Sequence, residues 1–292
     1  MDYTTIKTSL SDNILTLTLS RPDNLNAFTV DMANELINVF ETSNDDDEIR
    51  VIVVTGEGRA FCAGMDLSVA GNVFGLNEEI QPTIEDMHTR LNDPEIAKGV
   101  RDTGGKVNLA IYNCKKPVIA AINGAAVGIG ATMTCAMDIR LASEYARVGF
   151  VFNKIGITPE AGSSWFLPKI VGVSTALEWC YTGEILKPDT LLNAGYVKAV
   201  YAADDLLEEA YIIARKIVKH SPVAIALTRQ MIYRNSAQDH PVEAHKVDSL
   251  AIYYQSLKDG KEGVAAFLEK REPVFKQKAS EMPPFYPWWT EA

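Results

Sequence analysis

The segment Pro117–Gly130 constrains the fold of this chain more than any other. Val118–Ile122 is a short run of apolar residues, which is typical of a strand buried on both faces. Asn123 ends the run, and several glycines follow before a series of small, helix-compatible residues at Ala131–Met137. The order predicts a strand, a glycine-lined turn and the start of a helix in direct succession.

Such a turn can bind a group that carries or develops negative charge. Glycine allows close approach to the main chain, and the first amides of a helix have no partner within the helix. A phosphate-binding loop would need Gly-Lys-Ser/Thr after the glycines, and none is present. The dinucleotide-binding motif has a third glycine, which the segment starting Gly128-Ile129-Gly130 lacks. The hydrolase nucleophile motif Gly-x-Ser-x-Gly is absent from the sequence. A pair of amide donors for an oxyanion remains, although a helix that simply packs closely on a sheet would use the same small residues.

The composition is that of an ordinary globular protein and excludes several classes of function. Of 292 residues, 47% are hydrophobic and 23% are charged. The net charge of −10 argues against nucleic-acid and anionic-membrane binding. We find no signal-peptide pattern and no apolar run of transmembrane length. The cysteines follow no metal or redox pattern, which predicts free thiols, a cytoplasmic location and no metal; they are Cys62, Cys114, Cys135 and Cys180. We also predict no cofactor.

Periodicity divides the chain into a mixed first part and a helical last part. A hairpin is predicted at 4–19, a helix after the N-cap Thr29, and strands at 51–54, 118–122, 139–142, 148–152 and 197–201. The repeated strand–turn–helix order favours an α/β fold. Helices are predicted at 174–181, 188–194, 204–220, 222–235, 244–257 and 261–271. We therefore predict a core at 1–203 and a helical assembly region at 204–292.

Two segments do not fit this regular pattern. Residues 68–106 contain scattered glycines and prolines among weak helical segments, which predicts either a lid or a surface insertion. The tail from Pro273 is predicted to be irregular, and we expect its aromatic residues, including Trp288 and Trp289, to pack onto another subunit.

In this order and spacing, the segments resemble the crotonase (enoyl-CoA hydratase/isomerase) superfamily over nearly the whole chain. The residues that carry the likeness are 24–27, 61–66, 117–130, 138, 156–162 and 262–271. The resemblance implies a spiral of ββα units followed by a C-terminal helical region. It also implies a homotrimer or a dimer of trimers, and an acyl-CoA thioester as substrate.

The resemblance also implies how the site works. The oxyanion hole would be formed by the backbone amides of Met65 and Ile129. Family hydratases carry two glutamates, but this chain has Thr132 and Phe152 at those positions, so a two-glutamate hydratase is not expected. Instead, the segment 157–164 is similar to that of peroxisomal-type Δ3,Δ2-enoyl-CoA isomerases, in which a glutamate at the position of Glu160 moves the proton.

Further residues are implied to contact the substrate or its coenzyme A. Phe152, Trp165 and Phe166 are candidate walls of an apolar pocket, and Asp66 is expected to shape the loop beside one oxyanion donor. Phe267 and Lys270 would approach the coenzyme, from the same chain or from a neighbouring subunit. The complete binding set is Arg21, Ala27, Ala63, Asp66, Leu67, Thr132, Phe152, Trp165, Phe267 and Lys270. Asp138 is expected to cap or anchor the turn after the central helix.

The leading interpretation is an enzyme that shifts the double bond of an enoyl-CoA from Δ3 to Δ2. One glutamate suffices, because the same base can remove a proton at C2 and return it at C4. Two alternatives remain: a hydratase that activates water through Glu160 or another carboxylate, and a non-catalytic acyl-CoA binder.

Overall fold

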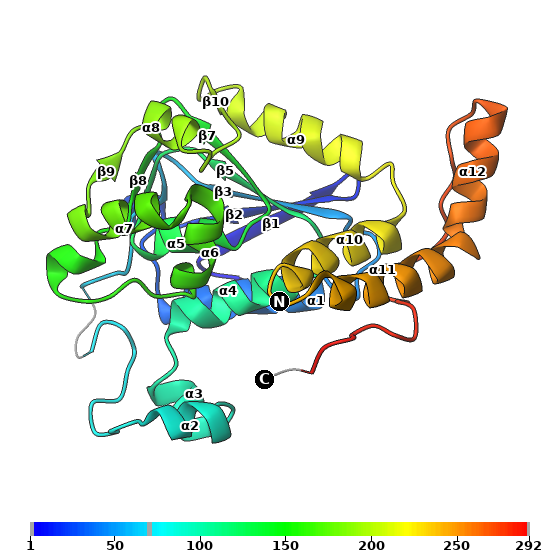
Figure 1. The fold of residues 1–292 in the computed structure, drawn as a ribbon. Helices are drawn as coiled ribbons and strands as arrows, with labels where there is room; N and C mark the ends of the chain where they lie inside the picture. Colours follow the sequence, from blue (N-terminus) through cyan, green and yellow to red (C-terminus); the bar gives the residue numbers. More distant parts are fainter. Residues whose placement is uncertain (1–2, 69–71, 291–292) are drawn as a thin grey trace.

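The computed structural model describes residues 3–68 and 72–290, so 69–71 of the irregular segment lie outside the described residues. The larger of its sheets has six strands in the order β1-β2-β3-β5-β7-β10 (Figure 1). Only β1 and β2 pair in antiparallel fashion within it, joined by a turn in which Asp12 and Asn13 have positive φ. These strands are Ile6–Ser11, Ile14–Leu19, Val51–Gly56, Val118–Ile122, Ile139–Ser143 and Ala199–Tyr201.

A second sheet of four strands has the order β4-β6-β8-β9, formed by Ala60–Cys62, Ala125–Val127, Arg147–Gly149 and Ile185–Leu186. The chain alternates between the sheets, since β3, β5 and β7 join the larger one and β4, β6 and β8 join the smaller one. This alternation confirms the expected spiral of ββα units. Gly56 and Gly124 lie where the chain passes between sheets, and a Cβ atom at either would collide with a backbone oxygen of the 59–60 segment.

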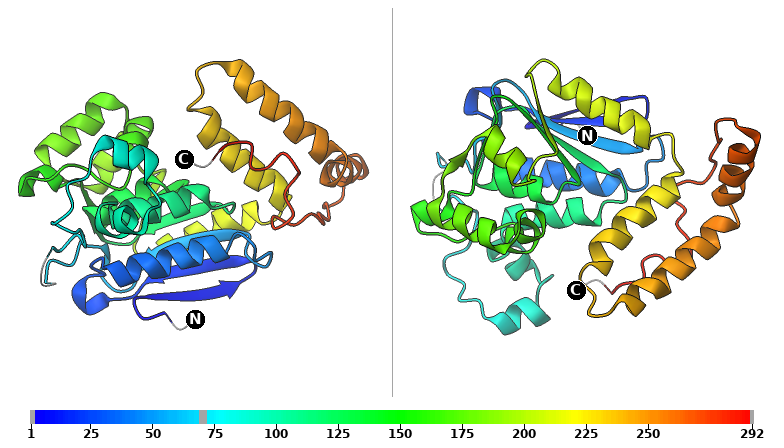
Figure 2. Two further views of the ribbon diagram at one scale, coloured as in Figure 1. Left: turned by 90° about the horizontal axis from the view of Figure 1, so that it is seen from below. Right: turned by 45° about the horizontal axis from the view of Figure 1, so that its top comes forward.

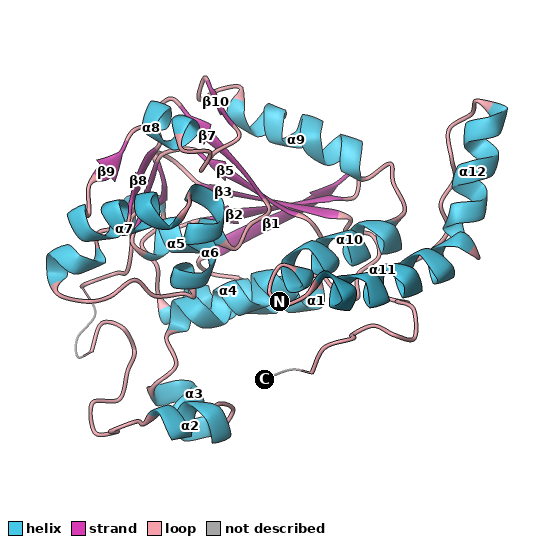
Figure 3. Cartoon of the chain, viewed as in Figure 1, coloured by secondary structure: helices cyan, strands magenta, loops and turns pink. Residues whose placement is uncertain are grey.

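Helices cover both faces of the larger sheet (Figures 1 and 3). On one face α9 (Leu206–Ile217) packs against β2, β3, β5 and β7. On the other, α1 (Val30–Thr42) and α4 (Thr103–Asn113) lie side by side over the main core. The side chain of Thr29 caps α1, as predicted. The remaining helices up to residue 193 are α2 (Ile84–Thr89), α3 (Pro94–Gly99), α5 (Ile129–Cys135), α6 (Ser163–Val171), α7 (Val173–Thr182) and α8 (Pro188–Asn193), with 3-10 turns at Pro22–Asn24 and Phe152–Ile155.

The last three helices extend away from the sheets (Figure 2). They are α10 (Pro222–Asn235), α11 (Pro241–Ser256) and α12 (Asp259–Glu269). The tail beyond them is irregular, as predicted, but its aromatic residues pack on their own chain. Phe285, Tyr286 and Trp288 cover Val223 and Leu227 of α10, and the expected packing of the tail onto another subunit stays a prediction. The apolar face shared by α10 and α11 requires this cover. The division of the chain at residue 203 stays a prediction.

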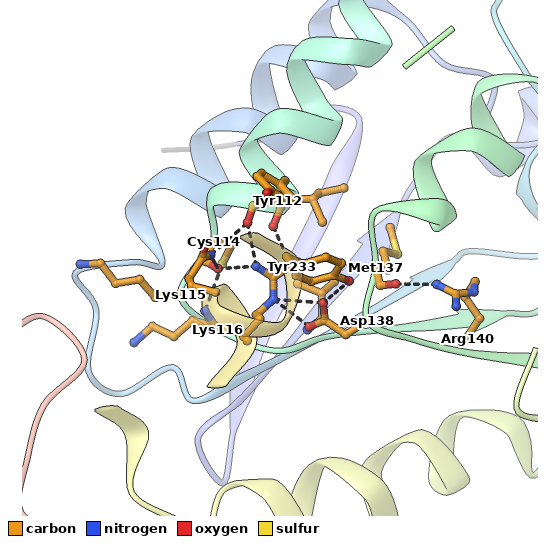
Figure 4. A network of polar contacts seen from close by, with 12 residues as sticks. Tyr112, Cys114, Lys115, Lys116, Met137, Asp138, Arg140 and Tyr233 are labelled. Carbon is orange, nitrogen blue, oxygen red and sulfur yellow. Dashed lines mark hydrogen bonds and ion pairs between the residues drawn. The ribbon is translucent and has the colours of Figure 1, made fainter. Parts of the chain in front are cut away.

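A buried ion pair ties α10 to the core (Figure 4). Asp138 lies 2.8 Å from Arg229 and accepts hydrogen bonds from the Tyr233 hydroxyl and from the Val118 amide. Arg229 also donates to the carbonyl oxygens of Tyr112 and Cys114 at the end of α4. Asp138 therefore anchors the turn after α5, as expected, and in addition fixes α10.

Within 3–68 and 72–290, no helix is long and apolar enough to cross a membrane, and no cluster of His, Cys, Asp and Glu is arranged to hold a metal ion. All four cysteines are free thiols.

Candidate functional site

A cavity of about 340 Å³ opens where the two sheets meet the irregular segment. Apolar groups form most of its wall. Met65 and Ile129 face it from the two glycine turns, and Glu160 faces it from the segment before α6. Other lining residues are Phe28, Ala63, Leu67, Phe74, Leu76, Asp102, Gly104, Val127, Val151, Phe152, Ile155 and Ile157.

The two glycine turns bring the predicted oxyanion donors to this cavity. Gly64 has a φ of +111° and lies so close to the second turn that its Cβ would be 3.3 Å from the Val127 oxygen. Gly128 has a φ of +56°, and the amide of Ile129 follows it at the start of α5. Met65 is held by a parallel bridge to Phe28 that uses the neighbouring amide and carbonyl groups. Among the hydrogen bonds between described residues, none uses the amide of Met65 or Ile129 as donor. Both amides are therefore available to a carbonyl oxygen.

Glu160 lies in a tight turn that aims its carboxyl group into the cavity. The next two residues, Ala161 and Gly162, both have positive φ, and Asn108 of α4 donates a 2.6 Å hydrogen bond to the Ala161 carbonyl oxygen. The Thr132 hydroxyl of α5 donates a 2.7 Å hydrogen bond to Glu160 Oε1. The turn, α4 and α5 thus fix the position of this carboxyl group together.

A second carboxyl group, that of Asp102, lies beside Glu160. Burial is the largest of the causes that together raise the pKa of Glu160 to about 8. The hydrogen bond from Thr132 lowers this pKa, and the neighbouring Asp102 contributes to the rise. Asp102 is the N-cap of α4, where its side chain accepts a hydrogen bond from the Gly105 amide. When two carboxyl groups lie side by side, the state in which the pair holds one proton is favoured over the state in which both groups are ionised.

Asp102, Gly104 and helix α4 were not predicted from the sequence. One signal was present: an aspartate followed by Thr103 and two glycines is a helix start with unusually little side-chain volume. The volume matters because a Cβ at Gly104 would overlap the Glu160 carboxyl group and Ile129. Only the tertiary arrangement shows that this helix start faces Glu160.

The predicted binding residues of the first 70 positions form one cluster beside Met65. Arg21 and Asp66 are joined by an ion pair of 2.8 Å, and Arg21 also donates to the Ala27 carbonyl oxygen. Hydrogen bonds from Ser68 and Arg21 lower the pKa of Asp66 to about 2. Asp66 therefore shapes its loop, as expected. Ala63 and Leu67 line the cavity.

Several other predicted binding residues do not lie at the cavity. Trp165 and Phe166 are absent from its lining and pack edge-on against Tyr112, because α6 turns this face toward α4. Of the three predicted walls, only Phe152 lines the cavity. Phe267 lies on α12 with 82% of its side chain exposed, and Lys270 ends the same helix, away from the cavity (Figure 1). Their contact with coenzyme A, through a neighbouring subunit, stays a prediction.

The family model described as "Enoyl-CoA hydratase/isomerase" matches residues 9–98 and 82–278. The chain belongs to this family. It is 40% identical to the enoyl-CoA hydratase AFT3-1 of Alternaria alternata over 93% of this chain and 86% of that protein. It is 31% identical to the 1,2-epoxyphenylacetyl-CoA isomerase of Escherichia coli K12 over 94% of this chain and 98% of that enzyme.

The fold agrees with solved structures of the family. An enoyl-CoA hydratase from Bacillus anthracis superimposes with a TM-score of 0.80 at 30% identity, covering 94% of this chain and 99% of that one. Relatives named for hydration and for isomerisation therefore share this architecture. Membership in the enoyl-CoA hydratase/isomerase family supports an enzyme that acts on acyl-CoA thioesters. Which reaction it catalyses depends on the acid–base groups of this chain.

Proposed function

We propose that this enzyme moves the double bond of a 3-enoyl-CoA to the 2 position, with Glu160 as the proton shuttle. The observation that carries the proposal is the placement of the Glu160 carboxyl group in the same cavity as the amides of Met65 and Ile129. The two hydratase glutamate positions hold Thr132 and Phe152, which cannot act as acid or base near neutral pH. Glu160 is the group that remains to take the α-proton.

The mechanism begins with the thioester carbonyl oxygen between the two amides. Each donor of this kind is typically worth ~3 kcal/mol of transition-state stabilisation. The carbonyl becomes a better electron acceptor, so Glu160 can remove a proton from C2 and form a dienolate. The C3–C4 double bond becomes a C2–C3 double bond as Glu160 returns the proton to C4. One proton is removed from C2 and one is delivered to C4, the electron pair stays within the substrate, and no cofactor is required.

Thr132 keeps the Glu160 carboxyl group oriented during these two transfers. Its hydroxyl donates to Oε1, which leaves the other oxygen available for the substrate. This hydrogen bond also favours the ionised form of Glu160 against the effect of burial. The apolar wall formed by Phe28, Phe74 and Phe152 suits an acyl chain.

Hydration of a 2-enoyl-CoA is the second candidate, and one observation favours it. Asp102 provides a second carboxyl group beside Glu160, so the pair could bind and activate a water molecule. The relative from Alternaria alternata also carries the name of a hydratase. A water molecule would need space between the carboxyl groups and the C3 atom of the substrate.

Product analysis distinguishes the two reactions. Purified enzyme is incubated with 3-enoyl-CoA and 2-enoyl-CoA thioesters of several chain lengths, and the products are separated by chromatography and mass. Isomerisation conserves mass, whereas hydration adds one water molecule to give 3-hydroxyacyl-CoA. Glu160→Gln should abolish isomerisation with little change in acyl-CoA affinity, since the amide matches the carboxyl in size but is not basic. Wild-type isomerisation by Glu160→Gln would refute the proposal, and so would 3-hydroxyacyl-CoA as the sole product.

A further inference from the structure

A second cavity lies behind the Asp102–Glu160 pair. It has a volume of about 350 Å³, and we call it the rear cavity. Arg101, Lys106 and Leu109 line it from the start of α4, and Ala161 and Phe166 line it from the turn after Glu160 and from α6. Asp102 lines both the rear cavity and the cavity that holds Glu160. It therefore lies at the boundary between the two.

The two carboxyl groups differ in their access to water. Asp102 is exposed, whereas Glu160 is half-buried and lines the first cavity but not the rear one. An acyl chain bound against the apolar wall would cover Glu160. Asp102, which lines both cavities, would then remain as a route from Glu160 to solvent.

Asp102 is held in a fixed orientation in which it can receive a proton. Its Oδ1 accepts hydrogen bonds from the amides of Gly105 and Ala161, which belong to α4 and to the turn after Glu160. Lys106 interacts electrostatically with Asp102 from the side of the rear cavity.

We propose that Asp102 passes protons between Glu160 and the water of the rear cavity. A proton removed from substrate C2 resides on Glu160, moves to the Asp102 carboxylate and is released to water. A solvent proton returns along the same path, and Glu160 delivers it to carbon. One proton leaves and one enters, and nothing is oxidised or reduced. Asp102 acts through Glu160 and not on the substrate; the inference rests on the proposed abstraction of the C2 proton.

The test follows deuterium from a 3-enoyl-CoA labelled with deuterium at C2, during turnover in ordinary water. Mass spectrometry of the 2-enoyl-CoA product gives the fraction of label transferred to C4. Asp102→Asn keeps an oxygen for the Gly105 amide but cannot take up a proton. The matched control is Asp93→Asn, since Asp93 begins α3, pairs with Arg90 and lines neither cavity.

The wild type and Asp93→Asn should lose most of the label to water, and Asp102→Asn should retain it. The ratio of exchange to transfer should fall roughly tenfold or more, since acid–base groups typically contribute ~10²–10⁴-fold. A residue that only supports the fold would change the turnover rate without changing this ratio. Equal label retention in the wild type and in Asp102→Asn overturns the relay.

A second measurement separates failure of the relay from failure of the proposed function. A saturated acyl-CoA is incubated in D2O, and deuterium uptake at C2 is followed by NMR. If the enzyme exchanges C2 protons but does not isomerise, the proposed function is refuted. The relay is then supported if Asp102→Asn exchanges the C2 proton more slowly than the wild type, and overturned if the two rates are equal. Absence of C2 exchange in the wild type overturns the relay as well.

Discussion

At the level of single residues, the environment of Glu160 opposes the form in which it must begin the reaction. A base has to be ionised to take a proton, yet burial, together with the neighbouring Asp102, raises the pKa of Glu160 to about 8. At pH 7 only a minority of molecules would therefore carry the ionised base. A raised pKa also makes the protonated shuttle a moderate acid, which suits the return of the proton to C4.

The first prediction follows from this titration. In the free enzyme, kcat/KM for isomerisation should rise with pH, with a midpoint near pH 8, and level off above it. Asp102→Asn should move the midpoint to lower pH, because it removes a negative charge beside Glu160. Initial rates between pH 5.5 and 9.5, with stability checked at each pH, measure both effects. A flat profile across this range would contradict the assignment of Glu160 as the base.

The second prediction concerns Gly104, whose missing side chain makes room for the Glu160 carboxyl group. Gly104→Ala should lower kcat about tenfold or more, since the new methyl group displaces the carboxyl from its position. Unfolding free energy should stay the same or rise by up to ~1 kcal/mol, because alanine favours the helix. Gly263→Ala in α12 is the control, since a Cβ there makes only ordinary contacts. Equal kcat in the two variants would show that Gly104 does not position the carboxyl.

At the level of elements, the site depends on turns rather than on regular structure. The turns at Gly64 and Gly128 both use positive φ, and so does the one after Glu160. Parallel strands β4 and β6 of the smaller sheet end directly before the first two turns and bring them to the same end of that sheet. The turns are therefore positioned by the core, while their own backbone conformations depend on a few glycines.

The third prediction tests one of these turns. Gly64→Ala should lower kcat by up to ~10²–10³-fold with a smaller effect on KM, because a strained φ and the Val127 oxygen would misdirect the Met65 amide. Met65→Leu should remain close to the wild type, since only the amide donates. Steady-state kinetics on both variants, with folding verified by circular dichroism, provide the measurement. The amide role of Met65 would be excluded if Met65→Leu were the more damaged of the two.

The elements predicted from the sequence are those in which apolar residues recur at the regular spacing of a strand or a helix. The opening hairpin, α1, β3, β5 and the helices after residue 173 lie close to their predicted positions, because a buried strand or an amphipathic helix leaves its pattern in consecutive residues. The sequence did not predict β4, β6, α4 or α6. The first two have three residues each, too short for a period to be visible.

The site was predicted where it depends on local motifs and missed where it depends on tertiary contact. Met65, Ile129 and Glu160 line one cavity, and Thr132 donates to Glu160 from α5; the roles that the family motif implies for them stay predictions. Asp102 belongs to a segment without a regular pattern, and its proximity to Glu160 arises only when α4 packs beside α5. Trp165 illustrates the opposite error: an aromatic residue close to Glu160 in sequence faces away from the cavity.

At the level of the whole molecule, one buried ion pair connects the C-terminal helices to the core. Arg229 of α10 is almost fully buried, and its contacts reach both Asp138 and the carbonyl oxygens at the end of α4. The orientation of α10 depends on these contacts, and α11 packs on α10 in turn.

The fourth prediction is that Arg229→Met destabilises the protein by ~3–5 kcal/mol, because it leaves the Asp138 carboxylate without its partner. The double variant Arg229→Met/Asp138→Asn should recover part of this loss, since no unpaired charge remains. Denaturant titrations of the two single variants and the double variant give the coupling free energy. Additive effects would show that the pair does not act as a unit.

The fifth prediction links Glu160 to global stability. Its pKa is higher in the folded protein than in the unfolded chain, so its contribution to stability is fully present below about pH 4.5 and is lost as pH rises toward about 8. Glu160→Gln should therefore gain stability relative to the wild type as pH increases over this range, by a few kcal/mol at most. Denaturation midpoints at pH 5 and pH 8.5 test this. A difference between the two proteins that does not change with pH would contradict the raised pKa.

The oxyanion donors have a consequence for how such a chain can diversify. The amides of Met65 and Ile129 belong to the main chain, and no ordinary substitution of these side chains removes them. In the proposed mechanism, most point mutations would therefore leave carbonyl activation intact, while the choice of reaction would depend on a few carboxyl groups. One of those comes from a short turn and the other from an irregular segment between β4 and α4. A lineage could exchange either carboxyl group and test a new reaction without first losing the chemistry common to all of them.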